Sequence, residues 1–474
     1  MNVKVIPRTE QPPEPTPHVP GIIDISDFEY EGSFSLPRVP GVPQDEKAFF
    51  ESGITLRTVD GEKRMLLTTG TYAQDVYEVA IPEPGKFVGN DFSAVPVAEL
   101  RTVFGNLPID AEASKNGTMW YDGESGLLYW TNYHAYYTPH SASFPVLRSA
   151  RLDGGVLTEV RQWFLPENTP AHYKSFWGGV TGIPESFSEK YTGGRKLALG
   201  FGGSYSIVQT ASLGPAFAAV SPDMQTGVMS FQNVMYYPFP EACVRDGNYF
   251  YSRPGSGFAP PTAPWNGTWT STDGIGSGVF IDLPDKKGYL TFVRQGIGRI
   301  GYDYGGSNWN GKYQNAWYFY GYETLGKAAT GEIPNKDMIP RSVNIVEYPH
   351  DLTRENQYVA GSCFDPETRR LYLYTMWALK SGLYDDPVVH VYTVKKDGQD
   401  ANSTVSQAVP LKARTQNGTL YVSGLTPGQV WSIYAVTGQL LHHAIAGSGE
   451  AAVTLPAHGV YMVVSGNRTV KVIF

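Results

Sequence analysis

One stretch of twelve residues combines side chains that transfer protons with side chains that stack on flat ligands. Residues 129–140 read YWTNYHAYYTPH, with two histidines and five aromatic residues. Histidine exchanges a proton near neutral pH, and aromatic faces pack well against sugar rings. The alternative is that these tyrosines only cover a corner of a β-protein. The candidates are Tyr133, Tyr136 and Tyr137 for ligand binding and His134 and His140 for acid–base catalysis.

A second stretch, AHYKSFWGG (171–179), places a histidine and a tryptophan before two glycines. Glycine lets a backbone approach a ligand closely. We take His172 and Trp177 as candidate ligand-binding residues; the alternative is a connecting loop with a buried tryptophan.

Two longer segments, 241–274 and 293–326, mix arginines with aromatic rings. A loop as long as 241–274 is uncommon unless it is functional or disordered, and its aromatic residues argue against disorder. Arginine pairs with a carboxylate through two parallel hydrogen bonds. The candidates are Tyr251 and Arg253 for catalysis and Arg245, Arg294 and Tyr302 for ligand binding. A structural lid is the alternative for the first segment.

The elements that position these residues are β-strands. A hairpin of two apolar strands around a charged tip recurs at 53–72, 117–133, 277–296 and 361–378, and further strands follow several copies. A hairpin with two outer strands is a blade, and radial repetition of blades protects sheet edges. We therefore predict an all-β chain: a β-propeller of five to seven blades followed by a small antiparallel β-sandwich. The one helical signal is a short turn at 183–191.

The domain boundaries follow from shifts in composition. Residues 1–25 are rich in proline and predict an extended arm. The propeller is expected over 26–396, a polar linker over 397–408, and the sandwich over 409–474.

Composition excludes several classes of function. The net charge is −8 and no block of Lys or Arg interrupts it, so nucleic acid is not an expected partner. No apolar stretch approaches the roughly 18 residues of a membrane-spanning helix. The two cysteines, Cys243 and Cys363, fit no metal spacing, so we predict no metal and no cofactor. The first residues lack the apolar core of a signal peptide.

The tail resembles a known family. The marks are YAVTG at 434–438, LPAHGVYMV at 455–463 and a final strand TVKVIF. They resemble the C-terminal sorting domain of the type IX secretion system of Bacteroidota. The resemblance implies secretion or surface display through this domain. A phage that infects such a host and carries the module as a virion attachment piece is the alternative.

The body carries a second resemblance. FEYEGSFSLP (28–37) and residues 193–223 are similar to stretches of uncharacterised propeller proteins from environmental and phage genomes. The general layout is similar to that of propeller polysaccharide lyases, which use His, Tyr and Arg in a central groove. Their catalytic set does not align with this chain residue by residue.

Three functions stay open. The first is a secreted or surface-displayed propeller that binds a glycan or polysaccharide without cleaving it. The second is a lyase on uronate-containing glycan, in which Arg253 neutralises the carboxylate and a histidine and a tyrosine handle the proton. The third is a structural or receptor-binding virion protein. Whether the chain is an enzyme is uncertain, but no paired-carboxylate motif indicates a glycosidase.

Overall fold

The chain forms two compact units, Met1–Lys396 and Asp397–Phe474. Their structure is a computed structural model. The residues it describes are 19–37, 53–68, 75–86, 95–108, 115–133, 145–167, 169, 178–200, 216–236, 244–246, 249–251, 273–302, 309–348, 358–381, 384–396, 411–416, 419–425, 430–435, 440–446, 448–455, 459–465 and 468–473.

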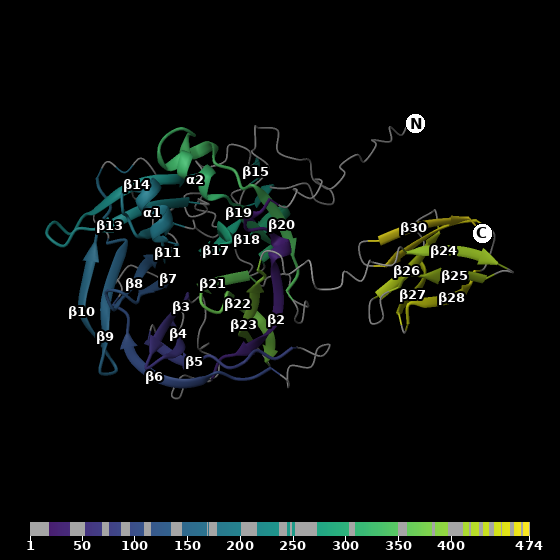
Figure 1. Ribbon diagram of the computed structural model, residues 1–474, viewed down its shortest axis with the longest axis horizontal. Coiled ribbons are helices and arrows are strands. Elements are labelled where there is room, and N and C mark those ends of the chain that lie inside the picture. Colours follow the sequence, from purple (N-terminus) through teal and green to yellow (C-terminus); the bar gives the residue numbers. More distant parts are fainter. Residues whose placement is uncertain are drawn as a thin grey trace. The chain divides into compact units, whose positions relative to one another are not determined.

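The first unit is a propeller whose described part has five blades: four are four-stranded sheets, and the other is a four-stranded core within a seven-stranded sheet (Figure 1). Blade 1 is β3 (Ile54–Val59), β4 (Glu62–Thr68), β5 (Asp75–Ala80) and β6 (Glu99–Asn106). Blade 2 is β7 (Lys115–Asp122), β8 (Leu127–Tyr133), β9 (Leu147–Asp153) and β10 (Val156–Trp163). Blade 3 is β11 (Gly179–Gly182), β12 (Leu197–Gly200), β13 (Ala216–Pro222) and β14 (Met229–Tyr236).

Blade 4 is β17 (Gly274–Asp282), β18 (Lys286–Tyr302), β19 (Trp309–Tyr320) and β20 (Ser342–Val346). Blade 5 is β21 (Tyr358–Asp365), β22 (Arg370–Ser381), β23 (Tyr384–Val394) and β2 (Phe28–Ser35). The predicted all-β propeller is therefore confirmed. The four predicted hairpins are the two inner strands of blades 1, 2, 4 and 5.

The N-terminal segment closes the ring. Strand β2 pairs with β23, so the outermost strand of the last blade comes from the start of the chain. Just before it, β1 (Gly21–Ile22) pairs in parallel with β18, and Asp27 forms a buried ion pair with Lys286. Residues 1–25 were expected to form an extended arm; within this range, Gly21 and Ile22 pair with β18 of blade 4.

Each pair of neighbouring blades encloses its own apolar cluster. One side chain from each facing sheet illustrates this: Leu66 and Leu128 for blades 1 and 2, Trp163 and Leu199 for blades 2 and 3, Phe217 and Tyr289 for blades 3 and 4, Trp317 and Leu371 for blades 4 and 5, and Val391 and Leu67 for blades 5 and 1. Burial of these faces holds the ring together.

The innermost strands β3, β7, β11, β17 and β21 lie next to one another around the axis (Figure 1). The end of the propeller at which these five strands finish is called the turn end. The opposite end, at which they begin, is called the loop end. At the turn end, tight hairpins with an acidic tip lead into the second strand. In blade 1 the tip is Asp60-Gly61 with positive φ at both residues, a geometry that glycine favours. Elsewhere Asp122 accepts a hydrogen bond from Ser125, and Asp365 accepts one from Thr368.

Two helices depart from the short-turn pattern. Helix α1 (Glu185–Tyr191) lies between β11 and β12, where a short helical turn was predicted. Helix α2 (Tyr322–Ala329) was not predicted, because it is only eight residues long and contains a glycine. Its Leu325 and Ala328 pack into the cluster between blades 3 and 4, so tertiary burial stabilises it. Neither helix has the length and apolarity needed to cross a bilayer, and the described residues contain no other candidate.

The second unit is the predicted sandwich of two antiparallel sheets. One contains β24 (Lys412–Gln416), β25 (Thr419–Ser423) and β28 (Glu450–Thr454). The other contains β27 (Leu440–Ile445), β26 (Val430–Ala435), β29 (Val460–Ser465) and β30 (Arg468–Ile473). Leu420, Trp431 and Val463 are buried between them.

Candidate functional site

The inner strands meet in a collar of small residues: Gly53, Thr118, Val180, Gly276, Ser277, Gly361 and Ser362. A methyl group on Gly276 would lie 1.9 Å from the carbonyl oxygen of Val359. The Thr118 hydroxyl donates to the Val180 carbonyl (3.1 Å), and Ser277 and Ser362 share a hydrogen bond of 2.6 Å. Small side chains thus let five strands approach one another closely.

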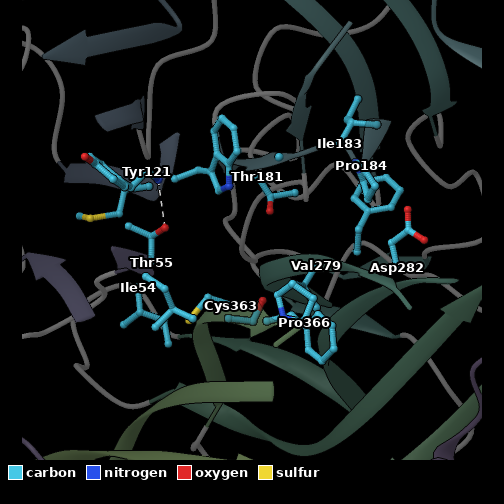
Figure 2. A pocket seen from close by; sticks show the side chains of 17 residues that line it. Ile54, Thr55, Tyr121, Thr181, Ile183, Pro184, Val279, Asp282, Cys363 and Pro366 are labelled. Carbon is cyan, nitrogen blue, oxygen red and sulfur yellow. Dashed lines mark hydrogen bonds between the residues drawn. The ribbon is translucent and has the colours of Figure 1, made fainter. Parts of the chain in front are cut away.

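On the turn-end side of the collar lies a cavity of about 410 Å³, to which all five inner strands contribute (Figure 2). It is lined by residues 54–56, 119–121, 181–184, 279, 280, 282, 362–364 and 366. Among the lining residues of β21 and the turn after it, exposure is greater away from the collar: Ser362 and Cys363 are buried, Phe364 is half-buried and Pro366 is exposed. The cavity therefore opens to solvent at the turn end.

The cavity wall is held by hydrogen bonds within the inner ring. Thr55 of β3 accepts a bond from the backbone N–H of Tyr121 (3.0 Å), the dashed line in Figure 2. The Asp282 carboxylate accepts a hydrogen bond from Ser186 of α1 and pairs with Lys287. Burial raises the pKa of the Cys363 thiol well above its ordinary value, so this part of the wall is uncharged.

The loop end is built up on blades 4 and 5. Strand β18 continues past the start of β17, where Gly274 stands opposite Arg294. Its added length pairs with a short hairpin of β15 (Val244–Asp246) and β16 (Tyr249–Tyr251), and with the start of β19. We call β15, β16 and residues 295–302 of β18 the blade 4 extension. In blade 5, β22 and β23 also pair beyond the first residue of β21.

The base of this extension is a fixed polar layer. The Arg294 guanidinium lies 3.5 Å from the centroid of the Tyr313 ring, a cation–π contact. Burial raises the pKa of Tyr313 to about 12, with Arg294 opposing the rise and Asp273 adding to it. The buried Asp273 accepts the backbone N–H of Gly296 (2.9 Å), and Gln314 donates to Gln295, which donates to the Tyr318 hydroxyl.

The structure brings four predicted residues to this extension and its base. Tyr251 stands opposite Arg299 of β18, Arg245 stands opposite Phe250, and Tyr302 stands opposite Trp309. Arg294 lies on β18, one residue before the extension begins. For Arg245, Tyr251 and Tyr302 the structure describes the backbone alone.

Of the other predicted residues, the structure describes Tyr133, and only by its backbone. The backbone of Tyr133 ends β8 opposite Lys115, the first residue of β7. His134, Tyr136, Tyr137, His140, His172, Trp177 and Arg253 lie outside the described residues. Among the residues that are described, no three His, Cys, Asp or Glu side chains gather as metal ligands.

The cavity residues were missed by sequence reasoning. Trp120 and Tyr121 stand in the segment 117–133, which was interpreted only as a structural hairpin. Their position just before the acidic tip Asp122 was the available signal, because the end of an inner strand must face the axis.

The chain matches no family model and no curated protein. Among solved structures it is similar to PorZ, an essential surface component of the type IX secretion system of Porphyromonas gingivalis. The identity is 11%, over 89% of this chain and 51% of that one, with a TM-score of 0.25. The chain thus spans about half the length of the PorZ chain.

Two further solved structures are similar. A DUF4221 member from Bacteroides vulgatus has 11% identity, covers 78% of this chain and 98% of its own, and has a TM-score of 0.32. A β-fructofuranosidase from Schwanniomyces occidentalis has 9% identity, 95% and 93% coverage, and a TM-score of 0.32. The fold assignment rests on the strand pairing of this chain itself.

Proposed function

We propose that this chain is a secreted or surface-displayed propeller that binds glycan at its loop end without cleaving it. The observation that carries the proposal is the register of the blade 4 extension, in which Arg245, Tyr251 and Tyr302 share one sheet. Aromatic and arginine side chains are enriched in binding hot spots, where their large contact areas are desolvated.

The base of the extension supports binding because it is rigid. Arg294 is held against Tyr313, and Gln295, Gln314 and Tyr318 form a continuous hydrogen-bonded chain. A site on ordered strands loses less conformational entropy when a ligand binds than a site on a mobile loop.

The test is a panel of neutral and uronate-containing glycans, with tryptophan fluorescence as the binding signal. We expect at least one glycan to bind and Tyr251→Ala or Arg245→Ala to weaken it by about tenfold. Arg101→Ala is the matched control, because Arg101 is a half-exposed arginine on the outer strand β6 that pairs with Glu99. Loss of affinity in the control as well, or no binding across the panel, contradicts the proposal.

Catalysis is tested on the same panel. A lyase produces an unsaturated uronate that absorbs in the ultraviolet, whereas a binding protein leaves absorbance unchanged over hours. We expect no change; a rise that His134→Ala or His140→Ala abolishes establishes the lyase instead.

We further propose that the sandwich directs export, as its resemblance to type IX sorting domains implies. Expression in a Bacteroidota host, with and without residues 397–474, tests this. The full chain is expected at the cell surface or in the medium, and the shortened chain is expected to stay inside the envelope. Equal distribution of both forms contradicts this role and leaves the virion alternative.

A further inference from the structure

The axial cavity at the turn end is chemically unlike the loop end. None of the residues that line it is Lys, Arg or His, and Asp282 is the one charged group among them. The Asp282 carboxylate is already held, with Lys287 2.5 Å from Oδ1 and the Ser186 hydroxyl 2.5 Å from Oδ2. An anionic ligand would find no Lys, Arg or His among the lining residues, and the neighbouring Lys287 ammonium is already paired with Asp282, so phosphates and uronates are disfavoured.

One wall of the cavity is a fixed aromatic surface. Trp120 lies against Gly182, where an added methyl group would come within 2.4 Å of the indole. Trp120 also stacks on Tyr129, with the ring centroids 6.1 Å apart and the planes inclined by 23°. Contacts with β11 and β8 thus fix the half-buried indole, and Trp120 is one of the residues that line the cavity.

Thr181 supplies a polar group to the same cavity. The Thr181 side chain points into the space between Asp282 and the opposite wall (Figure 2). It is half-buried, and its hydroxyl makes no hydrogen bond to any residue in the described part of the chain. A hydroxyl in this position favours a ligand that can donate to it or accept from it.

We propose that this cavity is a second binding site, which takes an uncharged hydroxylated ring: a neutral monosaccharide or a neutral sugar residue at the end of a glycan. The ring packs against the part of Trp120 that lines the cavity, and its hydroxyls bond to Thr181 and Asp282. The volume of about 410 Å³ lies within the range of about 300–1,000 Å³ of small-molecule sites. The inference does not depend on glycan binding at the loop end.

The full-length protein is titrated with methyl pyranosides of common neutral hexoses and with glucuronate, by calorimetry and by saturation-transfer NMR. We expect saturable binding of at least one neutral sugar and none of glucuronate. Thr181→Val removes the hydroxyl while keeping the volume, and is expected to weaken binding by about tenfold. Thr181→Ser keeps the hydroxyl and is expected to retain binding.

Thr158→Val is the matched control, because Thr158 is a half-buried threonine on the outer strand β10 and does not line the cavity. Unchanged melting temperature in each variant separates loss of contact from loss of fold. Absence of neutral-sugar binding, equal binding of glucuronate, or full affinity in Thr181→Val overturns the inference. Neutral-sugar binding that Tyr251→Ala abolishes and Thr181→Val spares places the sugar at the loop end, which also overturns it.

Discussion

The two ends of the propeller differ in how their residues are fixed. At the turn end, short hairpin turns follow four of the five inner strands and α1 follows β11, and the ends of these strands line the cavity. At the loop end, strands of blades 4 and 5 extend beyond the inner ring and carry arginines and aromatic residues. The lining of the turn-end cavity is mostly neutral, whereas the loop-end strands contain arginines as well as aromatic residues. The two ends of one propeller therefore differ in their chemistry.

The largest expected effect concerns the collar that separates the ends. Gly276→Ala places a methyl group 1.9 Å from the Val359 carbonyl oxygen, so one strand must move. We expect the free energy of unfolding of the propeller to fall by about 3 kcal/mol or more. Urea unfolding followed by tryptophan fluorescence measures it. Gly123→Ala is the control, since nothing lies within 4 Å of an added methyl group there; equal stability of both variants means that the collar is not tight.

The second largest loss of stability is expected at the ion pair that holds the N-terminal segment on blade 4. Asp27 and Lys286 are each about 3% exposed, and Lys286→Met leaves the carboxylate buried without its cation. We expect a loss of about 3 kcal/mol, because an uncompensated buried charge is costly. Lys327→Met, which breaks an exposed pair with Glu323, is expected to cost less than about 0.5 kcal/mol. Similar unfolding midpoints for the two variants contradict this account of ring closure.

A smaller effect, on the pH dependence of stability, is expected at the base of the blade 4 extension. The pKa of Tyr313 is raised to about 12, so its protonated form stabilises the fold below the unfolded pKa near 10. This stability is lost as the pH rises from about 10 towards 12. Arg294→Met removes the cation that opposes the rise, so Tyr313 is expected to ionise at still higher pH. Ultraviolet difference titration against Tyr313→Phe measures it, and a lower midpoint in Arg294→Met is the contrary result.

The smallest effect concerns the acidic tips at the turn end. Ser125 donates to Asp122, and Ser125→Ala removes this bond. We expect a cost of about 1 kcal/mol. Ser230→Ala, at an exposed serine of β14, is the control and is expected to change stability by less than about 0.5 kcal/mol. A cost as small as that of the control means that the tip geometry is set by the backbone alone.

Local patterns predicted the repeated elements well. Alternating apolar residues around a charged tip marked the inner hairpins of blades 1, 2, 4 and 5, because each hairpin is closed by residues within a few positions of one another. Blade 3 lacked this mark, since α1 separates its first two strands. The closing strand β2 could not be assigned to blade 5 either, because its partner β23 stands more than 350 positions later in the chain.

For the candidate sites too, the sequence indicated local features but not the long-range pairing. The aromatic and cationic composition of 241–274 and 293–302 was readable, but the pairing of Tyr251 with Arg299 depends on the length of β18. The residue types of Trp120 and Thr181 gave no signal, because a cavity residue on an inner strand has the same local pattern as a core residue. Only the position of the strand relative to the axis distinguishes the two.

By itself the sequence determined the all-β class, the hairpin repeats and the sandwich tail, since strand alternation and turn chemistry act between near neighbours. The tertiary structure alone decided which ends of which strands share a surface, and therefore that Arg245, Tyr251 and Tyr302 join one sheet while Trp120, Thr181 and Asp282 line one cavity. The physical reason is that sheets packed around an axis bring together residues hundreds of positions apart, and no local rule encodes that distance.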